Sequence, residues 1–366
     1  MDTRPCIRLS RRIIGPGNPV YVIAEAGVNH NGDPREAFRL IDAAREAGAD
    51  AVKFQYFSAN QLVAANAPTC QYQQMSIGAV DQRQMLRRLE LPIERFAELK
   101  IHADRIGVDF LVTPFGVSQL LELVDLGVSA LKIASPDLVN VPLLTAAAQS
   151  GAPIILSTGA SDLHEVDAAV HLLRGRRAAD RFALLHCVSA YPTHPADARL
   201  RCIRTLADRF NVPVGFSDHT ADPAFSLLAV SAGAVILEKH LTLDRSALGP
   251  DHFFSLTPRD FARYVAAARQ AHAALGDGVI ECSDAEREVR RLARGSIVST
   301  MHIRPGTRLT ADMVTVRRPG GGIDPLEWDR ILRSVARTDI LADTPLSWQM
   351  LDSRIDKPIS AAAIVD

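Results

Sequence analysis

The sequence predicts an α/β protein built on a (β/α)8 TIM barrel, followed by a small β-rich domain. Continuous apolar runs alternate with amphipathic helical segments along most of the chain, which is the pattern of a parallel sheet covered by helices. Eight such units over about 250 residues are the number that closes a barrel of this kind. An open, doubly wound sheet is the main alternative, but no GxGxxG motif follows the first apolar run.

Each predicted strand is a short apolar run that ends at a polar residue. We expect strands at Val20–Ala24, Ala51–Gln55, Asp109–Thr113, Ala130–Ile133, Ile154–Ser157, Phe182–His186, Val214–Phe216 and Val235–Lys239. We expect the helices at Asp33–Gly48, Ile93–Ile106, Val117–Leu126, Pro142–Ser150, Asp162–Leu173, Arg199–Phe210, Pro223–Ala232 and Ser255–Gly276. A hairpin over residues 8–14, followed by the Gly/Pro-rich turn at residues 15–19, precedes the first strand and could plug the bottom of the barrel.

The composition changes after the eighth unit. We expect a barrel domain over residues 1–280, a polar linker with a short helix over residues 281–294, a β-rich domain over residues 295–355 and a tail over residues 356–366. The β-rich domain contains RPG and RPGGG turns, and its one helix is expected over Glu327–Val335. A domain of about 60 residues buries little core of its own, so we expect it to pack on a partner surface.

Composition and charge exclude several classes of protein. The 366 residues carry a formal net charge of -1, so no overall field attracts nucleic acid or an anionic membrane. No apolar run approaches the ~18 residues of a membrane helix, and the N-terminus lacks the apolar core of a secretion signal. The five cysteines show no CxxC spacing, which favours reduced thiols and a cytoplasmic protein.

Polar side chains follow the predicted strands where each one ends, which is where barrel enzymes place their active sites. These residues are Glu25, Asn29, His30, Lys53, Gln55, Thr113, Lys132, Ser135, Ser157, Tyr191, Ser217, His219, Glu238 and His240. A single lysine such as Lys53 could simply extend its ammonium group to solvent. Two lysines at equivalent strand ends, Lys53 and Lys132, instead predict a site for a phosphate or carboxylate. Hydroxyl groups of Ser135, Ser157 and Ser217 would complete that site.

Two histidines follow neighbouring strands, His219 in SDH and His240 in EKH. Two imidazoles with few other protein ligands suit a divalent ion that keeps positions open for water and substrate. They do not suit a closed structural zinc site, which needs four protein ligands. Glu25 would act as a base or position a water near that ion, or would be a buried partner of Lys53.

Two further polar residues, Tyr191 and Asp251, lie on loops over the same rim of the predicted barrel. They could bind substrate hydroxyl groups, or they could simply stabilise the proline-rich turns around them.

A family resemblance rests on a series of motifs in order along the chain. The motifs EAGVNHNG, DAVKFQ, KIASPD, LSTGAS, HCVSAYPT, GFSDHT, EKHLTLD and GPDHFFSL resemble those of the N-acetylneuraminate (sialic acid) synthase family. The segment from Ser296 to about Leu351 resembles the antifreeze-like (SAF) domain attached to those enzymes. The resemblance covers nearly the whole chain, and it is specific for the family but only weakly specific for the sugar.

The resemblance implies a reaction and a role for each motif residue. The family condenses phosphoenolpyruvate with an N-acetylated aminosugar aldehyde and releases phosphate, which gives a nine-carbon 2-keto sugar acid such as N-acetylneuraminate. Phosphoenolpyruvate would bind Lys53, Thr113, Lys132, Ser135, Ser157, Ser189 and Ser217. The sugar would bind Gln55, Tyr191, Asp251 and Arg318. His219 and His240 would hold manganese or magnesium, and Glu25 would manage the attacking water and its protons.

Three positions depart from the family pattern. Ser189 stands where some members carry an asparagine, Gly116 where an aspartate is common, and Gly295 where a basic residue is frequent. The resemblance also implies a homodimer in which the tail domain of one chain, with Arg318, covers the barrel of the other.

The aminosugar stays open at this point. An N,N'-diacetyllegionaminate or related synthase is the nearest alternative, and the insertion Ser58–Leu91, with Ala67, Pro68, Tyr72 and Gln73, together with the RRPGGG loop, should decide it. A metal-dependent aldolase that uses pyruvate is a more distant alternative. A sugar-binding or ice-binding protein without turnover is the non-enzyme alternative.

Overall fold

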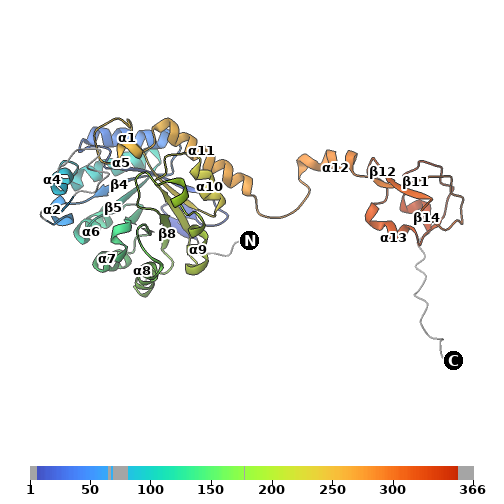
Figure 1. Cartoon of the computed structure of the whole chain (residues 1–366), viewed down its shortest axis with the longest axis horizontal. Coiled ribbons are helices and arrows are strands. Elements are labelled where there is room, and N and C mark those ends of the chain that lie inside the picture. Colours follow the sequence, from blue (N-terminus) through green and yellow to red (C-terminus); the bar gives the residue numbers. More distant parts are fainter. Residues whose placement is uncertain (1–5, 65–66, 69–80, 177, 353–366) are drawn as a thin grey trace, which may run out of the picture. The chain divides into compact units, whose positions relative to one another are not determined.

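The computed structural model describes residues 6–64, 67–68, 81–176 and 178–352. The chain divides into two compact units, Met1–Gly278 and Val279–Asp366. The sequence places this boundary two residues later, after residue 280. Figure 1 labels many of the helices and several of the strands of the two units.

The first unit is a closed barrel of eight parallel strands, which confirms the predicted fold. Its strands follow the chain order, and the last pairs with the first. They are β3 (Tyr21–Gly27), β4 (Ala51–Tyr56), β5 (Asp109–Pro114), β6 (Ala130–Ile133), β7 (Ile154–Ser157), β8 (Phe182–Cys187), β9 (Val214–Asp218) and β10 (Ile236–His240). The structure extends β9 to Asp218 and β10 to His240, so both strands reach the histidine segments.

Helices surround the strands on the outside of the barrel (Figure 1). They are α1 (Pro34–Glu46), α5 (Ile93–Ile106), α6 (Val117–Leu126), α7 (Val141–Gln149), α8 (Leu163–Gly175), α9 (Arg201–Phe210), α10 (Phe225–Ser231) and α11 (Pro258–Leu275). Local sequence explains several of their ends. The Asp33 side chain accepts a hydrogen bond from Arg35 N at the start of α1. Asp162 and Glu165 form a reciprocal capping box at the start of α8.

The predicted plug of the barrel is confirmed. Strands β1 (Ile7–Leu9) and β2 (Arg12–Ile14) pair antiparallel as a hairpin. Ile7, Leu9 and Ile14 are buried, and they pack in one cluster with side chains from the barrel interior such as Ile23 and Leu111. The hairpin therefore fills the lower end of the barrel, and the opposite end is left for a site.

The described part of the insertion between β4 and α5 contains the short helices α2 (Ala59–Leu62) and α4 (Gln82–Arg87), which lie side by side. Val28, Phe57, Met85 and Leu89 are buried together there, with Leu62, Leu86 and Phe115 packed against them. Tyr72 and Gln73, which the sequence associates with sugar choice, lie outside the described residues.

The second unit has a small core of its own. Strands β11 (Ser296–Ser299) and β12 (Val314–Arg317) pair antiparallel, as do β13 (Val335–Ala336) and β14 (Leu351–Asp352). Buried apolar side chains between them include Ile297, Val314, Ile331 and Leu346.

The predicted helix over Glu327–Val335 is wrong in extent, because α13 covers only Trp328–Ile331. The chain turns after Ile331, where the Ser334 hydroxyl donates to Arg330 O, and Val335 then joins β13.

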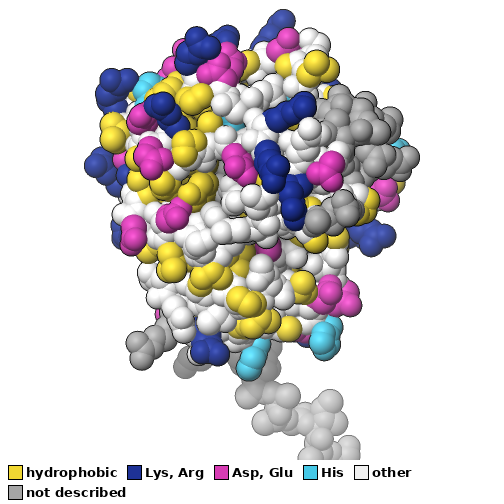
Figure 2. Space-filling view, turned by 90° about the vertical axis from the view of Figure 1, so that its left-hand side faces the viewer, with side chains coloured by type: hydrophobic (Ala, Val, Ile, Leu, Met, Phe, Trp, Pro, Cys, Tyr) yellow, Lys and Arg dark blue, Asp and Glu magenta, His cyan; other side chains and the backbone are white. Residues whose placement is uncertain are grey.

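Charges are mixed on the surface that Figure 2 presents, with Lys and Arg side chains interspersed among Asp and Glu side chains. This agrees with the small net charge of the sequence. No helix in the described part of the chain has the length and apolar character needed to cross a bilayer.

Candidate active site

A cavity of about 500 Å³ opens where the barrel strands end. Its lining contains most of the predicted site residues, namely Glu25, Lys53, Gln55, Thr113, Lys132, Ser135, Ser157, Tyr191, Ser217, His219, His240 and Asp251. Asn29 and His30 also follow a strand but do not line the cavity. The Asn29 amide instead donates to Leu241 O and Ser255 Oγ, and these hydrogen bonds connect the segment after β3 with the segments after β10.

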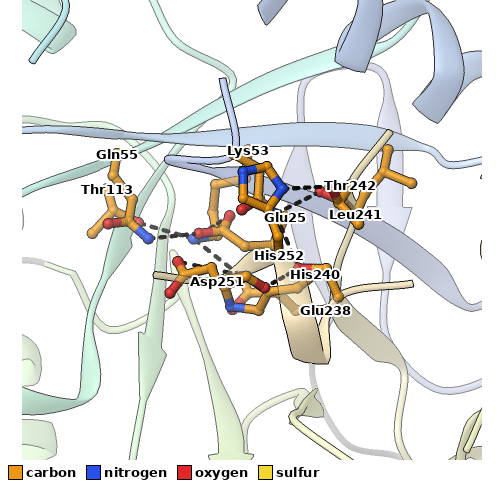
Figure 3. Close-up of polar contacts among 12 residues, drawn as sticks. Glu25, Lys53, Gln55, Thr113, Glu238, His240, Leu241, Thr242, Asp251 and His252 are labelled. Carbon is orange, nitrogen blue, oxygen red and sulfur yellow. Dashed lines mark hydrogen bonds and ion pairs between the residues drawn. The ribbon is translucent and has the colours of Figure 1, made fainter. Parts of the chain in front are cut away.

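Glu25 is held by two neighbours on β4. Lys53 Nζ lies 2.7 Å from Glu25 Oε2, and Gln55 Nε2 donates to Glu25 Oε1 at 3.0 Å. Figure 3 shows the three side chains pointing toward one another, with His240 and Asp251 beside them. A β-bulge at Glu25–Gly27 directs the carboxylate. Gly27 has φ +55°, and a Cβ there would lie 3.2 Å from Glu25 Oε1, so the bulge favours glycine.

Glu238 links both lysines, a role that sequence reasoning did not assign. Its carboxylate lies 3.3 Å from Lys132 Nζ and 3.7 Å from Lys53 Nζ, and it accepts from Ser217 Oγ at 2.9 Å. Alternation along β10 gives the signal that could have found it, because residues two apart on a strand face the same side and His240 faces the cavity. Although burial acts to raise it, Lys132 and Lys53 lower the pKa of Glu238 to about 2.

One end of the cavity is prepared for an anion. Burial lowers the pKa of Lys132, although the Glu238 carboxylate acts to raise it. Ser157 Oγ is buried and has no hydrogen-bond partner among the described residues. Ser135 Oγ accepts from Gly159 N at 2.9 Å. A negatively charged group beside Lys132 would restore its pKa and give the Ser157 hydroxyl a partner.

Ser189 is exposed and is not part of the cavity lining. It nevertheless lies close to the anion end, because a Cβ at Gly159 would be 2.5 Å from Ser189 Oγ and 2.8 Å from Ser135 Oγ. Burial raises the pKa of Tyr191, and a hydrogen bond with Ser189 acts in the opposite direction. The predicted role of Ser189 with phosphoenolpyruvate stays a prediction.

The two histidines face each other at the other side of the cavity. Their ring centroids are 5.5 Å apart, and the Tyr191 ring packs 4.3 Å from the His219 ring. His219 Nδ1 lies 2.9 Å from the Val188 carbonyl oxygen. Donation to that carbonyl places the proton on Nδ1 and leaves a lone pair on Nε2 for a ligand.

The donor set fits a divalent ion with a partly open coordination sphere. His240 Nδ1 is buried and lacks a hydrogen-bond partner among the described residues. It lies 4.0 Å from Asp251 Oδ2. Burial and the neighbouring Glu25 raise the pKa of Asp251 to about 7. The described residues contain no group of three or more His, Cys, Asp or Glu side chains placed as metal ligands. Any ion held by the two imidazoles would therefore take its remaining ligands from water and substrate.

Comparison with known proteins assigns the family. The NeuB family model matches residues 40–280, and the SAF domain model matches residues 294–352. The chain belongs to the NeuB family. It is 39% identical over 343 residues to an N,N'-diacetyllegionaminic acid synthase of Legionella pneumophila, which covers 93% of this chain and 96% of that relative. It is 36% identical over 324 residues to an enzyme of the same name from Campylobacter jejuni, over 88% of this chain and 97% of that relative.

A solved structure leads to the same family. The N-acetylneuraminic acid (sialic acid) synthetase of Leptospira borgpetersenii, crystallised with citrate, is 37% identical, with a TM-score of 0.71 over 78% of this chain and 95% of that one. These relatives are sugar-acid synthases, so this NeuB chain is an enzyme, and the resemblance drawn from the motifs is confirmed. The second unit is an SAF domain.

Arg318 is the predicted NeuB site residue that lies outside the barrel. It belongs to the SAF domain, where it is exposed in the segment after β12. Its contact with an N-acyl group therefore stays a prediction.

Proposed function

We propose that the protein condenses phosphoenolpyruvate with an N-acetylated mannosamine-type aldehyde and releases phosphate. One observation supports this most directly. A single cavity combines two buried lysines and a serine hydroxyl that lacks a partner among the described residues at one side with two imidazoles and a carboxylate at the other. Such a cavity can hold a small dianion beside an electrophilic carbonyl group.

The phosphate and carboxylate of phosphoenolpyruvate would bind at the anion end. Lys132 and the hydroxyl groups of Ser135 and Ser157 would contact the phosphate, and Lys53 with Thr113 would hold the carboxylate. Lys53 Nζ already donates to Thr113 Oγ1 at 3.1 Å, so its position is defined before substrate binds. The same donors would stabilise the phosphate as it leaves.

The reaction forms a carbon–carbon bond and a carbon–oxygen bond to water, and it breaks the carbon–oxygen bond to phosphate. C3 of phosphoenolpyruvate attacks the aldehyde carbon, whose oxygen takes up a proton. Water adds to C2, and the C2–O bond to phosphate then breaks. Glu25 would accept a proton from that water, since burial raises its pKa although Lys53 opposes this. A divalent ion, manganese or magnesium, held by His219 and His240 would polarise the aldehyde when bound.

The product has two candidates. N-acetylneuraminate is the product expected from the sequence. N,N'-diacetyllegionaminate is the second candidate, and the two relatives named as its synthases, at 39% and 36% identity, favour it.

Phosphate release tests the proposal. The protein is incubated with phosphoenolpyruvate, manganese and either N-acetylmannosamine or 2,4-diacetamido-2,4,6-trideoxymannose, with and without a chelator. We expect release that depends on a sugar and on the metal, and that is lost in the His219→Ala and His240→Ala variants. Full activity in those variants, insensitive to chelator, would remove the metal role. Turnover of pyruvate instead of phosphoenolpyruvate would favour the aldolase alternative.

We also propose a homodimer that exchanges its SAF domains, on the strength of the family resemblance. Mixed dimers of a Lys53→Met chain and an Arg318→Ala chain test it. In an exchanged dimer the intact barrel receives the intact Arg318 from its partner, so about a quarter of the wild-type activity should return. No recovery after verified subunit exchange, or a monomer in solution, would contradict the proposal.

A further inference from the structure

One side of the cavity is apolar. Seven side chains that line it form the cluster between the β4–α5 insertion and the strand ends, and we name this set the apolar wall: Val28, Phe57, Leu62, Met85, Leu86, Leu89 and Phe115. Four of them are buried to 7% exposure or less. Gln82 is the polar side chain that the described part of the insertion adds to the lining.

The apolar wall lies beyond the reacting groups. Lys53, Gln55 and Phe57 alternate along β4 and its extension, so their side chains face the same side and rise from the barrel interior to the rim. Lys53 and Gln55 both contact Glu25, and Phe57 belongs to the apolar wall. Along the strand, the residues that contact the reacting centre therefore come before the apolar wall.

We propose that the apolar wall binds the far end of the aminosugar chain and selects a sugar that ends in a methyl group, a 6-deoxy aldehyde. This inference rests on the proposed function. The aldehyde carbon, C1, must lie near Glu25 and His240, and the acetamido group on C2 is next to it. The far end of the six-carbon chain extends farthest from the aldehyde carbon, so it is the part best placed to reach a surface beyond the reacting centre.

Charge in the described lining disfavours a phosphorylated far end. Lys53 and Lys132 are the lysines in the described lining, which contains no arginine, and both face carboxylates in the barrel interior. Arg83 and Arg87 of the insertion bind Val63 O and Asn60 Oδ1, and Arg88 is exposed and is not part of the described lining. Residues 64–81 contain no lysine or arginine in the sequence. Within the described lining of its own barrel, a 6-phosphate would therefore meet apolar side chains without a cation.

A hydroxyl group is disfavoured for a related reason. A methyl group against Phe57 and Met85 loses contact with water at no polar cost, whereas a hydroxyl group there loses hydrogen bonds to water. Pockets of this kind discriminate by roughly 10- to 100-fold.

The test compares sugars that differ at C6 alone. Phosphate release from phosphoenolpyruvate is measured with 2-acetamido-2,6-dideoxymannose, with N-acetylmannosamine and with N-acetylmannosamine 6-phosphate. We expect kcat/KM for the 6-deoxy sugar to exceed that for the 6-hydroxy sugar by roughly 10-fold or more, with the 6-phosphate lowest. Equal values, or a preference for the 6-hydroxy sugar, would overturn the inference, and the second result would point to Gln82 as a hydroxyl partner.

Two variants locate the preference. Leu86 is half-buried in the wall, so Leu86→Gln should reduce the ratio at least about 5-fold by offering the hydroxyl group a partner. Leu126→Gln, a half-buried leucine of α6 outside the lining, should leave the ratio unchanged. If Leu86→Gln does not fold, Leu62→Gln on α2 replaces it. A ratio that neither wall variant changes would also overturn the inference.

The test of the apolar wall and the test of the proposed function can be told apart by their results. Release of phosphate with any of the sugars supports the proposed function, and only the ratio among sugars reports on the apolar wall. No release with any sugar would reject both.

Discussion

Lys53 Nζ lies 2.7 Å from Glu25 Oε2 and 3.7 Å from Glu238 Oε2, and the Lys53 and Glu25 side chains are exposed by only 4% and 2%. One buried ammonium group on β4 therefore balances the charges of two carboxylates, which come from the neighbouring strands β3 and β10. Burial acts to lower the pKa of Lys53, but Glu238 and Glu25 outweigh it and raise that pKa. Lys53 is thus both an expected substrate ligand and the centre of a buried charge network.

Replacing Lys53 should cost stability as well as activity. Lys53→Met leaves two carboxylates buried without this partner, so we expect a loss of roughly 3–5 kcal/mol in the free energy of unfolding. Lys100→Met is the control, because the Lys100–Asp104 pair lies on the surface of α5 and should contribute less than about 1 kcal/mol. Urea unfolding of both variants measures the difference. Equal losses would show that Lys53 is not the balancing charge.

Ser157 should contribute to the binding of phosphoenolpyruvate but not to the free energy of unfolding. Its Oγ is buried with no hydrogen-bond partner among the described residues, so Ser157→Ala should change the free energy of unfolding by less than about 1 kcal/mol. The lost contact should raise KM for phosphoenolpyruvate roughly 10-fold. The control is Ser226→Ala, since the buried Ser226 hydroxyl donates to Pro223 O away from the cavity and should leave KM unchanged. An unaltered KM in Ser157→Ala would remove Ser157 from the anion site.

The strands and the rim could be predicted because each depends on local pattern. A strand of a parallel barrel is buried on both faces, so β7 appears as an apolar run that ends at Ser157, and β6 as an apolar run interrupted by Lys132. The residues at or near the strand ends, such as Lys132 and Ser157, then converge by the geometry of the fold alone. Most of the predicted site therefore lines one cavity.

Other features depend on contacts between distant segments, and the sequence pattern does not show them. The role of Glu238 follows from its distances to two lysines on other strands. The apolar wall joins Val28 and Phe115 to the insertion, although each follows a different strand. The helix expected over Glu327–Val335 ends early because Val335 pairs with Asp352, a partner far along the chain.

A second buried ion pair lies directly behind the histidines. Asp218 on β9 and Lys239 on β10 are register partners, 3.2 Å apart and almost completely buried. Asp218 Oδ1 also accepts from Thr220 N at 2.8 Å, which holds the turn that follows His219. The pair therefore positions the ends of the two strands that carry His219 and His240.

A double-mutant cycle tests this pair. Lys239→Met should lower the free energy of unfolding by roughly 3–5 kcal/mol, because it leaves Asp218 buried and unpaired. Adding Asp218→Asn should recover part of that loss, with a coupling energy of about 1–3 kcal/mol. Additive losses in the two single variants would mean that the ion pair is not the stabilising contact.

His30 should make the free energy of unfolding decrease as the pH is lowered. Burial lowers its pKa from 6.5 to about 4, and its Nδ1 accepts from Gly32 N at 3.0 Å, which a protonated ring cannot do. Above pH 6.5 the ring is neutral in both states and the full stability is present. Between 6.5 and about 4 the unfolded chain takes up the proton first, so stability is lost by up to about 3 kcal/mol.

Urea unfolding at pH 7.5 and pH 4.5 measures this loss, and His30→Gln should remove the His30 part of it while other groups titrate as before. His171→Gln, at an exposed position on α8, is the matched control for replacing a histidine with glutamine. A His30→Gln variant with the wild-type pH dependence would mean that the buried imidazole is not the group that loses stability in acid.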